Sequence, residues 1–586
     1  MRNEMRVLVG FLFCICVGFS FCMKDDESIP TYFRKLADNG KLIDRGSKQY
    51  NQDIPNKFVT KISRKDASSV SLKVYPEVAE NGGLVAVNWY GVAEPNEKDF
   101  ISLYCPDDDN PKHYLDYFNI DVSVSWKAGF GEHFVPVFNM RTNCVFKYFR
   151  WVGEAGQLAA TSSVITFRGG PLAIHQIHLS LTGDPTQMRV MWVSSKAQEV
   201  IVNYGTTESL GQKETKFTSN TYKAGDLCHS PANDTGFWDP GYIYDVLLTG
   251  LEPNTKYYYT IQNEQNTSSI RSFMTAIPAG DKTPYKFFAY GDQGTDNAPQ
   301  GKATAKNVIL NLQQDEDFRL VFHNGDISYA LGYAYVWDQY FTLIEPYASR
   351  LPYMVGIGNH EYDHTYGGEH DPSHAEGEGY HPAWGNLGDD SNGECGVPMY
   401  HRFHMPNTGN KLWWYSYDYG MVHFIMMSTE HDFSPESPQY TWLEKDLKSV
   451  DRTKTPWIII GGHRAMYCSA LMPDDYVVSL NMQRLFEDLL HKYNVDLAFW
   501  AHYHSYERTC RVYKQQCSKT EGTVHMVIGA AGRSTDPDAW LPKPWSAYHY
   551  VDYGYGKVEV VNSTALKWEW VLNKSGQVFD TYWLTK

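Results

Sequence analysis

The chain has 586 residues, of which 42% are apolar and 15% are aromatic. A chain of this size and composition can bury several hydrophobic cores and is expected to fold as about three domains, which excludes an intrinsically disordered protein. Its formal charge of −16 provides no net basic field that could replace counterions released from a polyanion, so we expect no nucleic-acid partner.

Residues 1–22 have the pattern of a secretory signal peptide. Two arginines precede an apolar run from Val7 to Val17, and small residues surround a cleavage point after Cys22. A membrane anchor is the alternative, but the run is shorter than the ~20 residues of a span, and polar residues follow Cys22. We expect a protein without a membrane anchor that is secreted, or lies in the lumen of the secretory, lysosomal or vacuolar pathway. Four N-glycosylation sequons agree with this, at Asn233, Asn266, Asn562 and Asn573.

Cleavage after Cys22 would leave seven of the ten cysteines. In an oxidising compartment most of these should pair, with one left over. We expect Cys105 to pair with Cys144, because both lie in the first domain, and Cys510 with Cys517, because they close a short loop. The odd thiol would be buried and inert, or would link two copies of the chain, which leaves a homodimer open.

Two segments before residue 281 predict β-sandwich domains, and residues 23–67 precede them as a separate N-terminal segment. Residues 68–168 contain short runs of β-forming residues separated by Pro, Asp, Asn and Gly. Residues 169–280 repeat this pattern. Within them, LEPNTKYYYTI is typical of the turn into a late strand of a fibronectin III-like domain, with Tyr257 at its tyrosine corner. Neither segment contains a recognisable catalytic constellation, so both are expected to be scaffolds.

From residue 281 the pattern changes to strands that alternate with helical stretches, such as 440–450 and 481–493. This indicates an α/β domain over residues 281–522, in which ligands bind beyond the carboxyl ends of the strands. Residues 523–586 return to strands, which we expect to complete the second sheet of this domain. Among them, Leu566, Trp568 and Trp570 alternate with charged residues, as in a half-buried strand.

Five strand ends of the α/β domain carry residue types that bind metals: Asp292, Asp326, Tyr329, Asn359, His360, His463, His502 and His504. A single Gly-Asp turn or buried histidine is usually structural, but five such ends in one unit predict a binuclear metal site. We expect the glycines at 291, 325, 358 and 462 to allow sharp turns that direct the following side chains into a shared crevice. Two metal ions about 3.5–4 Å apart can coordinate a phosphoryl group together, which implies metal-assisted hydrolysis of a phosphate ester.

The blocks GDQG, GDISY, GNHE, GGH and AHYHSYER, in this order, resemble the five metal-ligand blocks of the purple acid phosphatases, within the metallophosphoesterase superfamily. The tyrosine in the second block separates this family from its relatives. Further stretches, such as DFISLYCP and PANDTGFWDPGYIYDVLL, resemble the leading domains of its large secreted members. The resemblance covers about residues 68–586. It implies two N-terminal β-sandwiches and a four-layer α/β metallophosphoesterase domain with two sheets between helices.

The resemblance also implies a ligand set for each metal. A ferric ion, Fe(3+), would be held by Asp292, Asp326, Tyr329 and His504. A divalent ion, Zn(2+), Mn(2+) or Fe(2+), would be held by Asp326, Asn359, His463 and His502, so that Asp326 bridges the two ions. His360 would be catalytic, by contacting the phosphate or assisting the leaving group. The alternative is a structural histidine braced by Glu361.

The leaving-group side of the pocket departs from many plant-type relatives, which carry a pair of histidines after the fourth block. The stretch that follows His463, RAMYCSALMPDD, has no histidine. Replacements could come from the loop of residues 362–384, which contains His364, His370, His374 and His381 and directly follows GNHE. The alternative for these four is an ordinary polar surface loop.

The sequence therefore predicts a secreted acid phosphatase that hydrolyses small phosphate monoesters. Larger relatives with this loop type include nucleotide pyrophosphatases and phosphodiesterases, so the same centre acting on diesters or pyrophosphates is a second interpretation. A third is a non-catalytic secreted binding protein with a relic metal site. All seven ligand positions are intact, which disfavours a relic.

Overall fold

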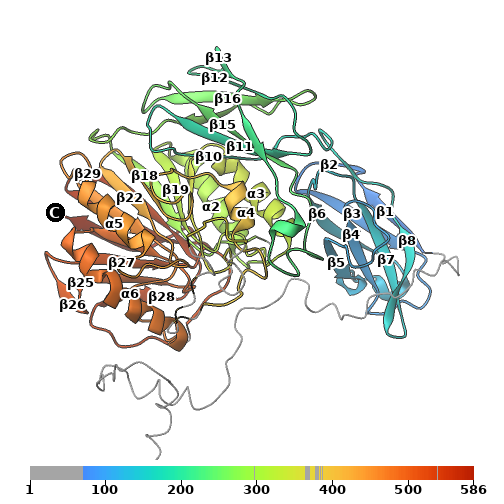
Figure 1. Cartoon of the computed structure of the whole chain (residues 1–586). Helices are drawn as coiled ribbons and strands as arrows, with labels where there is room; N and C mark the ends of the chain where they lie inside the picture. The colour runs from blue at the N-terminus through green and yellow to red at the C-terminus, as the bar shows by residue number, and fades with distance from the viewer. Residues whose placement is uncertain are drawn as a thin grey trace, which may run out of the picture. The chain divides into compact units, whose positions relative to one another are not determined.

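The computed structural model describes residues 70–295, 297–362, 370–375, 380, 382, 385, 387–537 and 539–586. The predicted signal peptide and the segment 23–67 lie outside the described residues, as do His364 and His381. Two β-sandwiches and an α/β domain follow one another along the described chain (Figure 1).

The first sandwich packs two main sheets around a core that includes Trp89, Ile101 and Tyr148. One sheet has the order β1 (Ser71–Tyr75), β3 (Gly83–Tyr90), β6 (Gly131–Val137). The other has the order β5 (Asp116–Asn119), β4 (Phe100–Tyr104), β7 (Val145–Val152), β8 (Ala155–Thr161). The short strands β2 (Val78–Ala79) and β9 (Thr166–Phe167) pair with each other, and the 3-10 turns η1 (Ile120–Val122) and η2 (Trp126–Ala128) precede β6.

The second sandwich has two four-stranded antiparallel sheets. Their orders are β10 (His175–Ser180), β11 (Met188–Ser194), β15 (Tyr242–Leu248), β14 (Thr218–Asn220), and β13 (Gln212–Glu214), β12 (Ile201–Gly205), β16 (Lys256–Gln262), β17 (Arg271–Met274). The short turn η3 (Ala224–Asp226) follows β14. The Tyr257 hydroxyl accepts a hydrogen bond from the Glu252 backbone N–H at 3.0 Å. This is the bond expected of a tyrosine corner.

The α/β domain contains two sheets. The six-stranded sheet has the order β20 (Tyr353–Gly356), β19 (Phe318–Asn324), β18 (Tyr285–Tyr290), β29 (Gly554–Asn562), β30 (Ala565–Leu572), β31 (Val578–Thr585). The eight-stranded sheet has the order β21 (Tyr415–Tyr419), β22 (Val422–Met426), β23 (Trp457–Gly461), β24 (Leu497–Trp500), β27 (Thr523–Ile528), β25 (Tyr506–Tyr513), β26 (Gln516–Ser518), with β28 (Ser546–Tyr550) beside β25. Strands β18 to β20 are parallel to each other, as are β22, β23, β24 and β27.

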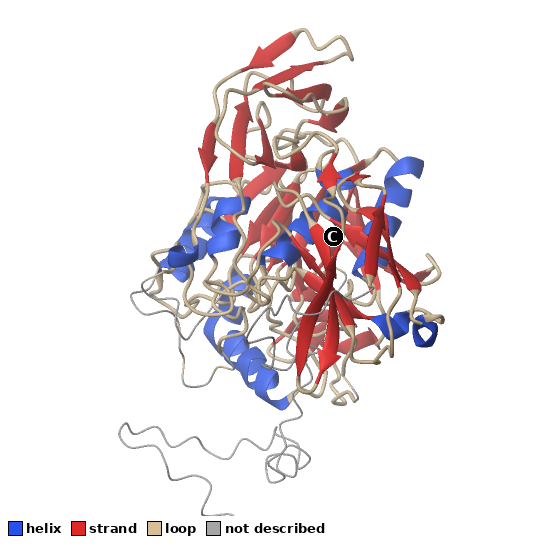
Figure 2. Ribbon diagram, turned by 90° about the vertical axis from the view of Figure 1, so that its right-hand side faces the viewer, coloured by secondary structure: helices blue, strands red, loops and turns tan. Residues whose placement is uncertain are grey.

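The two sheets lie between helices, so the domain has four layers (Figure 2). Phe322, Phe499 and Trp568 belong to the core between the sheets. The same core includes side chains of α2 (Gly301–Gln314) and α3 (Ala334–Ala348), while α5 (Pro438–Ser449) and α6 (Pro473–Lys492) pack with the eight-stranded sheet in a second core. The short α4 (Val397–Arg402) precedes β21. The predicted fold class is therefore confirmed.

The predicted helices at 440–450 and 481–493 correspond to α5 and to the second half of α6. In α5 the Ser437 side chain accepts a hydrogen bond from the Tyr440 N–H, and Pro438 occupies the first turn. In α6 Pro473 also begins the helix, with Asp474 and Asp475 in the first turn. Both starts satisfy or complement the free N–H groups of a helix N-terminus, which explains where these helices begin.

The C-terminal strands divide between the two sheets, so the expectation that they complete one sheet was wrong. Strands β27 and β28 join the eight-stranded sheet, whereas β29 to β31 extend the six-stranded sheet from β18. Antiparallel neighbours need no crossover helix, so the consecutive strands β29, β30 and β31 can pair directly from the open edge of β18. The alternation of Leu566, Trp568 and Trp570 was interpreted correctly, because all three are buried.

The two predicted disulfides, Cys105–Cys144 and Cys510–Cys517, are present. A third, Cys228–Cys395, joins the second sandwich to the α/β domain across 167 residues of sequence. Cys468 is the free thiol among the described residues, and it is buried. The alternative of a buried odd cysteine is therefore the one that the structure supports.

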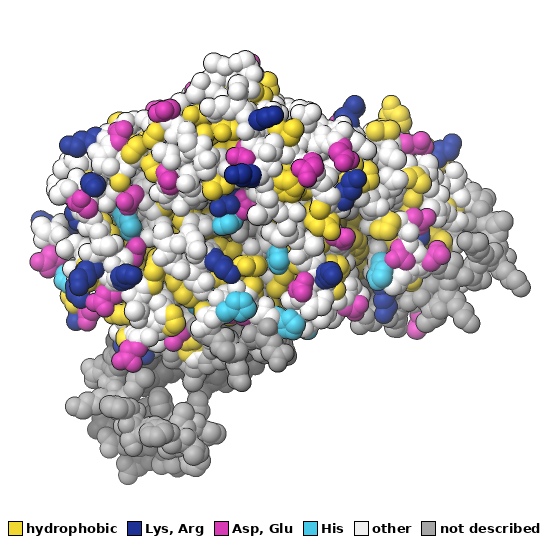
Figure 3. All heavy atoms as spheres, turned by 45° about the horizontal axis from the view of Figure 1, so that its top comes forward, with side chains coloured by type: hydrophobic (Ala, Val, Ile, Leu, Met, Phe, Trp, Pro, Cys, Tyr) yellow, Lys and Arg dark blue, Asp and Glu magenta, His cyan; other side chains and the backbone are white. Residues whose placement is uncertain are grey.

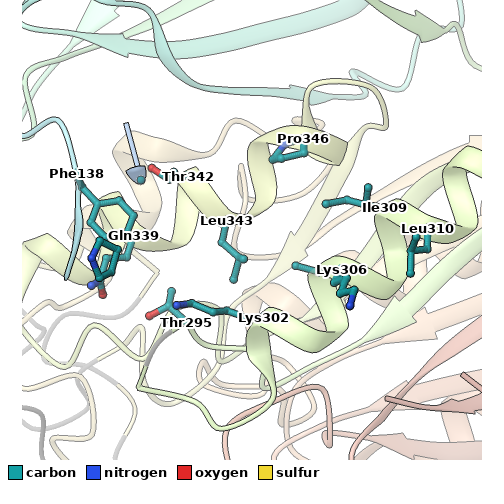
Figure 4. Close-up of a pocket in the computed structure, with 13 residues that line it drawn as sticks. Phe138, Thr295, Lys302, Lys306, Ile309, Leu310, Gln339, Thr342, Leu343 and Pro346 are labelled. Atoms are coloured by element: carbon teal, nitrogen blue, oxygen red, sulfur yellow. The ribbon is translucent and has the colours of Figure 1, made fainter. Parts of the chain in front are cut away.

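Helix α3 is the element against which both sandwiches pack. Its Asp338 accepts hydrogen bonds from Arg141 of the first sandwich and Gln176 of the second. A cavity of about 390 Å³ lies where the first sandwich meets α2 and α3. Figure 4 shows its lining, which includes Phe138, Lys302, Lys306, Ile309, Gln339 and Leu343. The lining contains none of the predicted metal ligands.

Two observations bear on the expected secretion. Asn573 is only 6% exposed, and its side-chain amide donates to the Thr304 hydroxyl at 2.7 Å. A glycan at Asn573 is therefore incompatible with this packing, whereas Asn562 is exposed. Among the helices of the described residues, none combines the length and the hydrophobicity needed to span a bilayer.

His423 on β22 makes the stability of the fold sensitive to pH. Its two ring nitrogens lie 2.6 Å from Asp418 and 2.9 Å from Asp446. Burial alone would lower the pKa of His423, but these two carboxylates raise it to about 9. The unfolded value is about 6.5, so this contribution is complete below about pH 6.5 and is lost as the pH rises through about 9.

We therefore expect His423→Gln to remove a pH-dependent part of the free energy of unfolding. Between about pH 6 and pH 9.5 the wild type should lose on the order of 2 kcal/mol more than the variant. Urea unfolding of both proteins at the two pH values measures this difference. An identical pH dependence in both proteins would contradict the assignment.

Candidate metal centre

The seven predicted ligands meet at one edge of the α/β domain, beyond the carboxyl ends of parallel strands from both sheets. From the six-stranded sheet come Asp292 after β18, Asp326 and Tyr329 after β19, and Asn359 after β20. From the eight-stranded sheet come His463 after β23, and His502 and His504 after β24. The binding position expected for an α/β sheet is thus the position observed.

Four of these seven residues have left-handed backbone conformations: Asp292, Asp326, Tyr329 and His502, with φ between 49° and 68°. Such a conformation costs about 1–3 kcal/mol for a residue with a side chain, and it persists only where the surrounding structure fixes it. Backbone strain of this kind gathers at functional sites, and here it lies on the candidate ligands themselves.

The preceding glycines act differently from the sequence-based expectation. Of the four, only Gly325 has a positive φ, of 83°. Gly358 is required for another reason, because a Cβ at this position would collide with the carboxylate of Asp326. The glycines therefore mainly allow neighbouring turns to approach closely, while left-handed turns fall on Asp292 and Asp326, which follow two of them.

Asp292, Tyr329 and His504 form the first ligand cluster. The Tyr329 hydroxyl lies 2.8 Å from Asp292 Oδ1 and 3.0 Å from His504 Nε2. Asp292 Oδ1 and His504 Nε2 are 3.1 Å apart. A carboxylate oxygen of Asp326 lies within 4.8 Å of the ligand atoms of Asp292 and His504.

Asn359, His463 and His502 form the second cluster. Asn359 Oδ1 lies 2.9 Å from His463 Nε2 and 3.0 Å from His502 Nδ1. Asp326 Oδ1 is 3.3 Å from His463 Nε2. Because Asp326 belongs to both groups of potential ligand atoms, it is positioned to be shared by two ions.

The outer partners of the two histidines show that the second cluster fits a cation. His463 Nδ1 lies 2.9 Å from the Asn324 carbonyl oxygen, and His502 Nε2 lies 3.0 Å from Asp475 Oδ1. Each neutral ring must donate its N–H to that acceptor, so its other nitrogen presents a lone pair to Asn359 Oδ1. Three acceptor atoms facing one another repel unless a positive charge lies among them. A proton on His463 supplies this charge when no metal is bound, and a metal ion can take its place, so this donor set suits a metal ion.

His504 in the first cluster is arranged in the same way. Its Nδ1 contacts the Ser534 hydroxyl and lies 3.4 Å from Asp536 Oδ2. A neutral ring that donates from Nδ1 presents a lone pair from Nε2 to Asp292 and Tyr329. A carboxylate behind a ligating histidine both fixes its tautomer and raises its basicity.

The charges of the cluster favour bound cations. Burial would raise the pKa of Asp326, but His463 and His360 lower it well below its usual range. Burial would likewise lower the pKa of His463, but Asp326 and Asp292 raise it to about 10. Burial and the Asp292 carboxylate raise the pKa of the Tyr329 phenol well above its usual value, so its ionisation requires an added cation.

His360 lies on the open side of the clusters. Its side chain is 26% exposed, and its Nε2 is 3.8 Å from Asp326 Oδ2. Its Nδ1 lies 2.9 Å from the Asp390 carbonyl oxygen, so Nε2 is the ring nitrogen nearer to Asp326. Glu361, the partner expected in the structural alternative, instead accepts hydrogen bonds from backbone N–H groups.

Family models match three consecutive parts of the chain. "Purple acid Phosphatase, N-terminal domain" matches residues 174–275, and "Calcineurin-like phosphoesterase" matches residues 285–506. "Iron/zinc purple acid phosphatase-like protein C" matches residues 522–581.

Individual proteins are similar over most of the chain. "Probable inactive purple acid phosphatase 9" of Arabidopsis thaliana is 32% identical, over 88% of this chain and 85% of its own length. "Acid phosphatase type 7" of Mus musculus is 32% identical, over 70% of this chain and 90% of its own length. The solved structure of purple acid phosphatase PPD1 from yellow lupin (Lupinus luteus) seeds is 29% identical, with a TM-score of 0.77 over 88% of this chain and 96% of that chain.

The chain belongs to the purple acid phosphatase family. The resemblance carried by the five sequence blocks is thereby confirmed.

Sequence reasoning missed the role of Glu361 in this purple acid phosphatase. Its buried carboxylate accepts hydrogen bonds from the backbone N–H groups of Asp326, Ile327 and Gly358, at 2.8–2.9 Å. It thereby holds the second and third blocks against each other. The residue was visible in the motif GNHE, but no spacing in the sequence shows which backbone groups it binds.

The partners behind the candidate ligands were missed as well: Asp390 behind Asn359, Asp475 behind His502, and Asp536 with Ser534 behind His504. Asp475 lies in the first turn of α6, and the others lie in loops outside the five blocks. Their residue types are ordinary for loops and helix starts, so only their placement reveals them.

The loop histidines proposed for the leaving-group side remain a prediction. Of the four, His370 and His374 fall within the described residues, and His374 is exposed. Neither belongs to the two groups of potential metal-ligand atoms found among the described residues.

Glu361→Ala would leave three buried N–H groups without their acceptor. An unsatisfied buried group costs about 1–3 kcal/mol, so we expect the free energy of unfolding to fall by more than about 3 kcal/mol. Denaturant unfolding measures the change. Glu361→Gln keeps a carbonyl acceptor and should lose clearly less, whereas an Ala variant as stable as the wild type would show that these bonds contribute nothing.

Proposed function

We propose that this chain is a metal-dependent phosphatase that hydrolyses phosphate monoesters at acid pH. The observation that supports this most directly is the convergence of seven ligating side chains into two clusters that share Asp326. The family supplies the reaction class, and the clusters supply the residues that would perform it in this chain.

The name of the Arabidopsis relative favours a different candidate, a non-catalytic protein with a relic metal site. Two features of this chain weigh against it. Every one of the seven positions holds a ligating residue type. The residues behind the histidines, Asp475 and Asp536, also remain in place. A relic site is under no requirement to keep either its ligands or their partners.

We propose that Fe(3+) is held by Asp292, Asp326, Tyr329 and His504, and that Zn(2+), Mn(2+) or Fe(2+) is held by Asp326, Asn359, His463 and His502. Carboxylate and phenolate oxygens suit the harder, more highly charged ion, and imidazoles with an amide oxygen suit a divalent first-row ion. Bound together, such a pair of ions would activate a water molecule and neutralise the charge of the phosphoryl group.

His360 is the proposed catalytic side chain. The Asp390 carbonyl accepts its Nδ1–H, which leaves Nε2 on the open side of Asp326. From there a protonated ring could donate to the leaving oxygen, or stabilise charge that develops on it. Its partial exposure is consistent with contact to a substrate that enters from solvent.

We further propose a secreted, N-glycosylated protein whose partner is a small phosphorylated substrate and not a nucleic acid. The disulfides fit an oxidising compartment. On the face drawn in Figure 3, basic and acidic side chains are interspersed. The net charge of −16 would repel a polyanion at longer range.

Turnover of three substrates tests the proposal. Purified protein should hydrolyse p-nitrophenyl phosphate faster than bis(p-nitrophenyl) phosphate or ATP at acid pH, and elemental analysis should find iron. Faster turnover of ATP or of the bis-ester would favour the pyrophosphatase and phosphodiesterase interpretation. Protein without iron and without turnover of any of the three would favour a non-catalytic role.

Tyr329→Phe tests the proposed ferric ligand. The change removes one oxygen while the ring keeps its packing, so the fold should survive. A phenolate bound to Fe(3+) would give the protein a visible charge-transfer band, and this band should disappear in the variant. Absorption spectroscopy measures the band, and an iron assay measures the bound iron. Asp326→Asn should be more severe, with loss of both ions, because a neutral amide bridges two cations poorly. A Phe variant that kept both colour and iron would show that Tyr329 is only a core aromatic residue.

A further inference from the structure

We infer that Asp390, which lies outside the five sequence blocks, sets the orientation of the Asn359 amide and thereby the affinity of the divalent-metal site. Its carboxylate Oδ2 accepts a hydrogen bond from Asn359 Nδ2 at 3.0 Å. Its backbone carbonyl is the acceptor 2.9 Å from His360 Nδ1. One residue therefore contacts the side chains of both Asn359 and His360 in the third block. The inference rests on the proposed function, because it takes the second cluster to bind a metal.

An asparagine can serve as an oxygen ligand only if its amide is oriented correctly. In this structure Asn359 Oδ1 faces His463 Nε2 and His502 Nδ1, at 2.9 and 3.0 Å. In the neutral rings that metal binding requires, both nitrogens present lone pairs, because the Asn324 carbonyl and Asp475 accept the N–H groups on the other side of the rings. Against neutral rings with no ion between them, the flipped orientation would compete, since Nδ2 would then donate to those lone pairs.

Asp390 disfavours the flipped orientation. An ionised carboxylate only accepts hydrogen bonds, so it favours the orientation in which Asn359 Nδ2 faces it. In the flipped orientation, the amide oxygen would lie against the carboxylate and repel it. Asp390 thus holds the amide ready for a cation before one arrives, which is how a partner behind a ligand raises metal affinity.

The segment that carries Asp390 is anchored to the second sandwich. Cys395 forms the disulfide with Cys228, and the Cys228 N–H donates to the Gly393 carbonyl at 2.9 Å. Asp389 Oδ2 lies 2.9 Å from His229 Nε2. These contacts flank Asp390 on both sides, so its position is fixed in part from outside the third block that it orients. The second sandwich therefore supports the metal site from outside the α/β domain.

Asp390→Ala in the full-length protein tests the inference. Zinc affinity, measured by competition with a chelator, should fall by about 10- to 100-fold. Iron content and the visible absorption band should stay unchanged, because Asp390 contacts no residue of the first cluster among its described hydrogen bonds. General destabilisation would lower the affinity for both ions, so a lower affinity for zinc alone would distinguish the proposed role of Asp390 from it.

Two matched variants complete the experiment. Asp390→Asn keeps an acceptor oxygen but adds a donor, so it should restore only part of the zinc affinity. Asp474→Ala removes an exposed carboxylate from the first turn of α6 and should leave zinc affinity at the wild-type value. An Ala variant with wild-type zinc affinity would overturn the inference, as would equal loss of iron and zinc with a lower free energy of unfolding. Wild-type protein that binds neither ion would instead overturn the proposed function itself.

Discussion

The burial of the Asp326 carboxylate is the constraint on which the rest of the centre depends. The residue is 1% exposed, and a second buried carboxylate, Glu361, accepts its backbone N–H. Burial and the nearby Asp326 raise the pKa of Glu361 to about 8, so the negative charge of this buried pair rests on Asp326 and requires compensating positive charge. Imidazoles of the chain supply part of this positive charge. The negative charge that remains uncompensated gives the site its affinity for cations. The left-handed turns and the close glycine contacts are the geometric means of bringing these groups together.

The two sandwiches stabilise the segment that carries this charge. Asp326 and Tyr329 lie in the turn between β19 and α3, so the position of α3 constrains both residues. The first sandwich binds α3 through Arg141 and Asp338, and the second binds it through Arg271 and Glu345. Both ion pairs are largely buried, so breaking either one would leave a charge without its partner. Domains without catalytic residues of their own thus restrict the movement of a ligand-bearing turn.

Much of this arrangement could be predicted from the sequence, because the information was local. The five blocks, the strand and helix alternation and the tyrosine corner at Tyr257 each depend on residues close in the chain. The rest depends on residues that are distant in sequence. Asp390 and Asp536 act from loops with no distinctive composition, and Cys228 pairs across 167 residues. The left-handed conformation of Asp292 likewise results from packing of the whole domain, which no propensity encodes.

The pairing of β18 with β29 has a consequence for biosynthesis. Strand β18 ends at Tyr290, whereas β29 begins at Gly554, close to the end of the chain. During translation, one edge of β18 therefore remains unpaired while the intervening residues are made, which at ~5–20 residues per second takes roughly ten seconds to a minute. An apolar strand with open hydrogen-bonding groups is prone to associate with other chains. Nascent copies of this protein thus depend on dilution or on chaperones until the last three strands emerge.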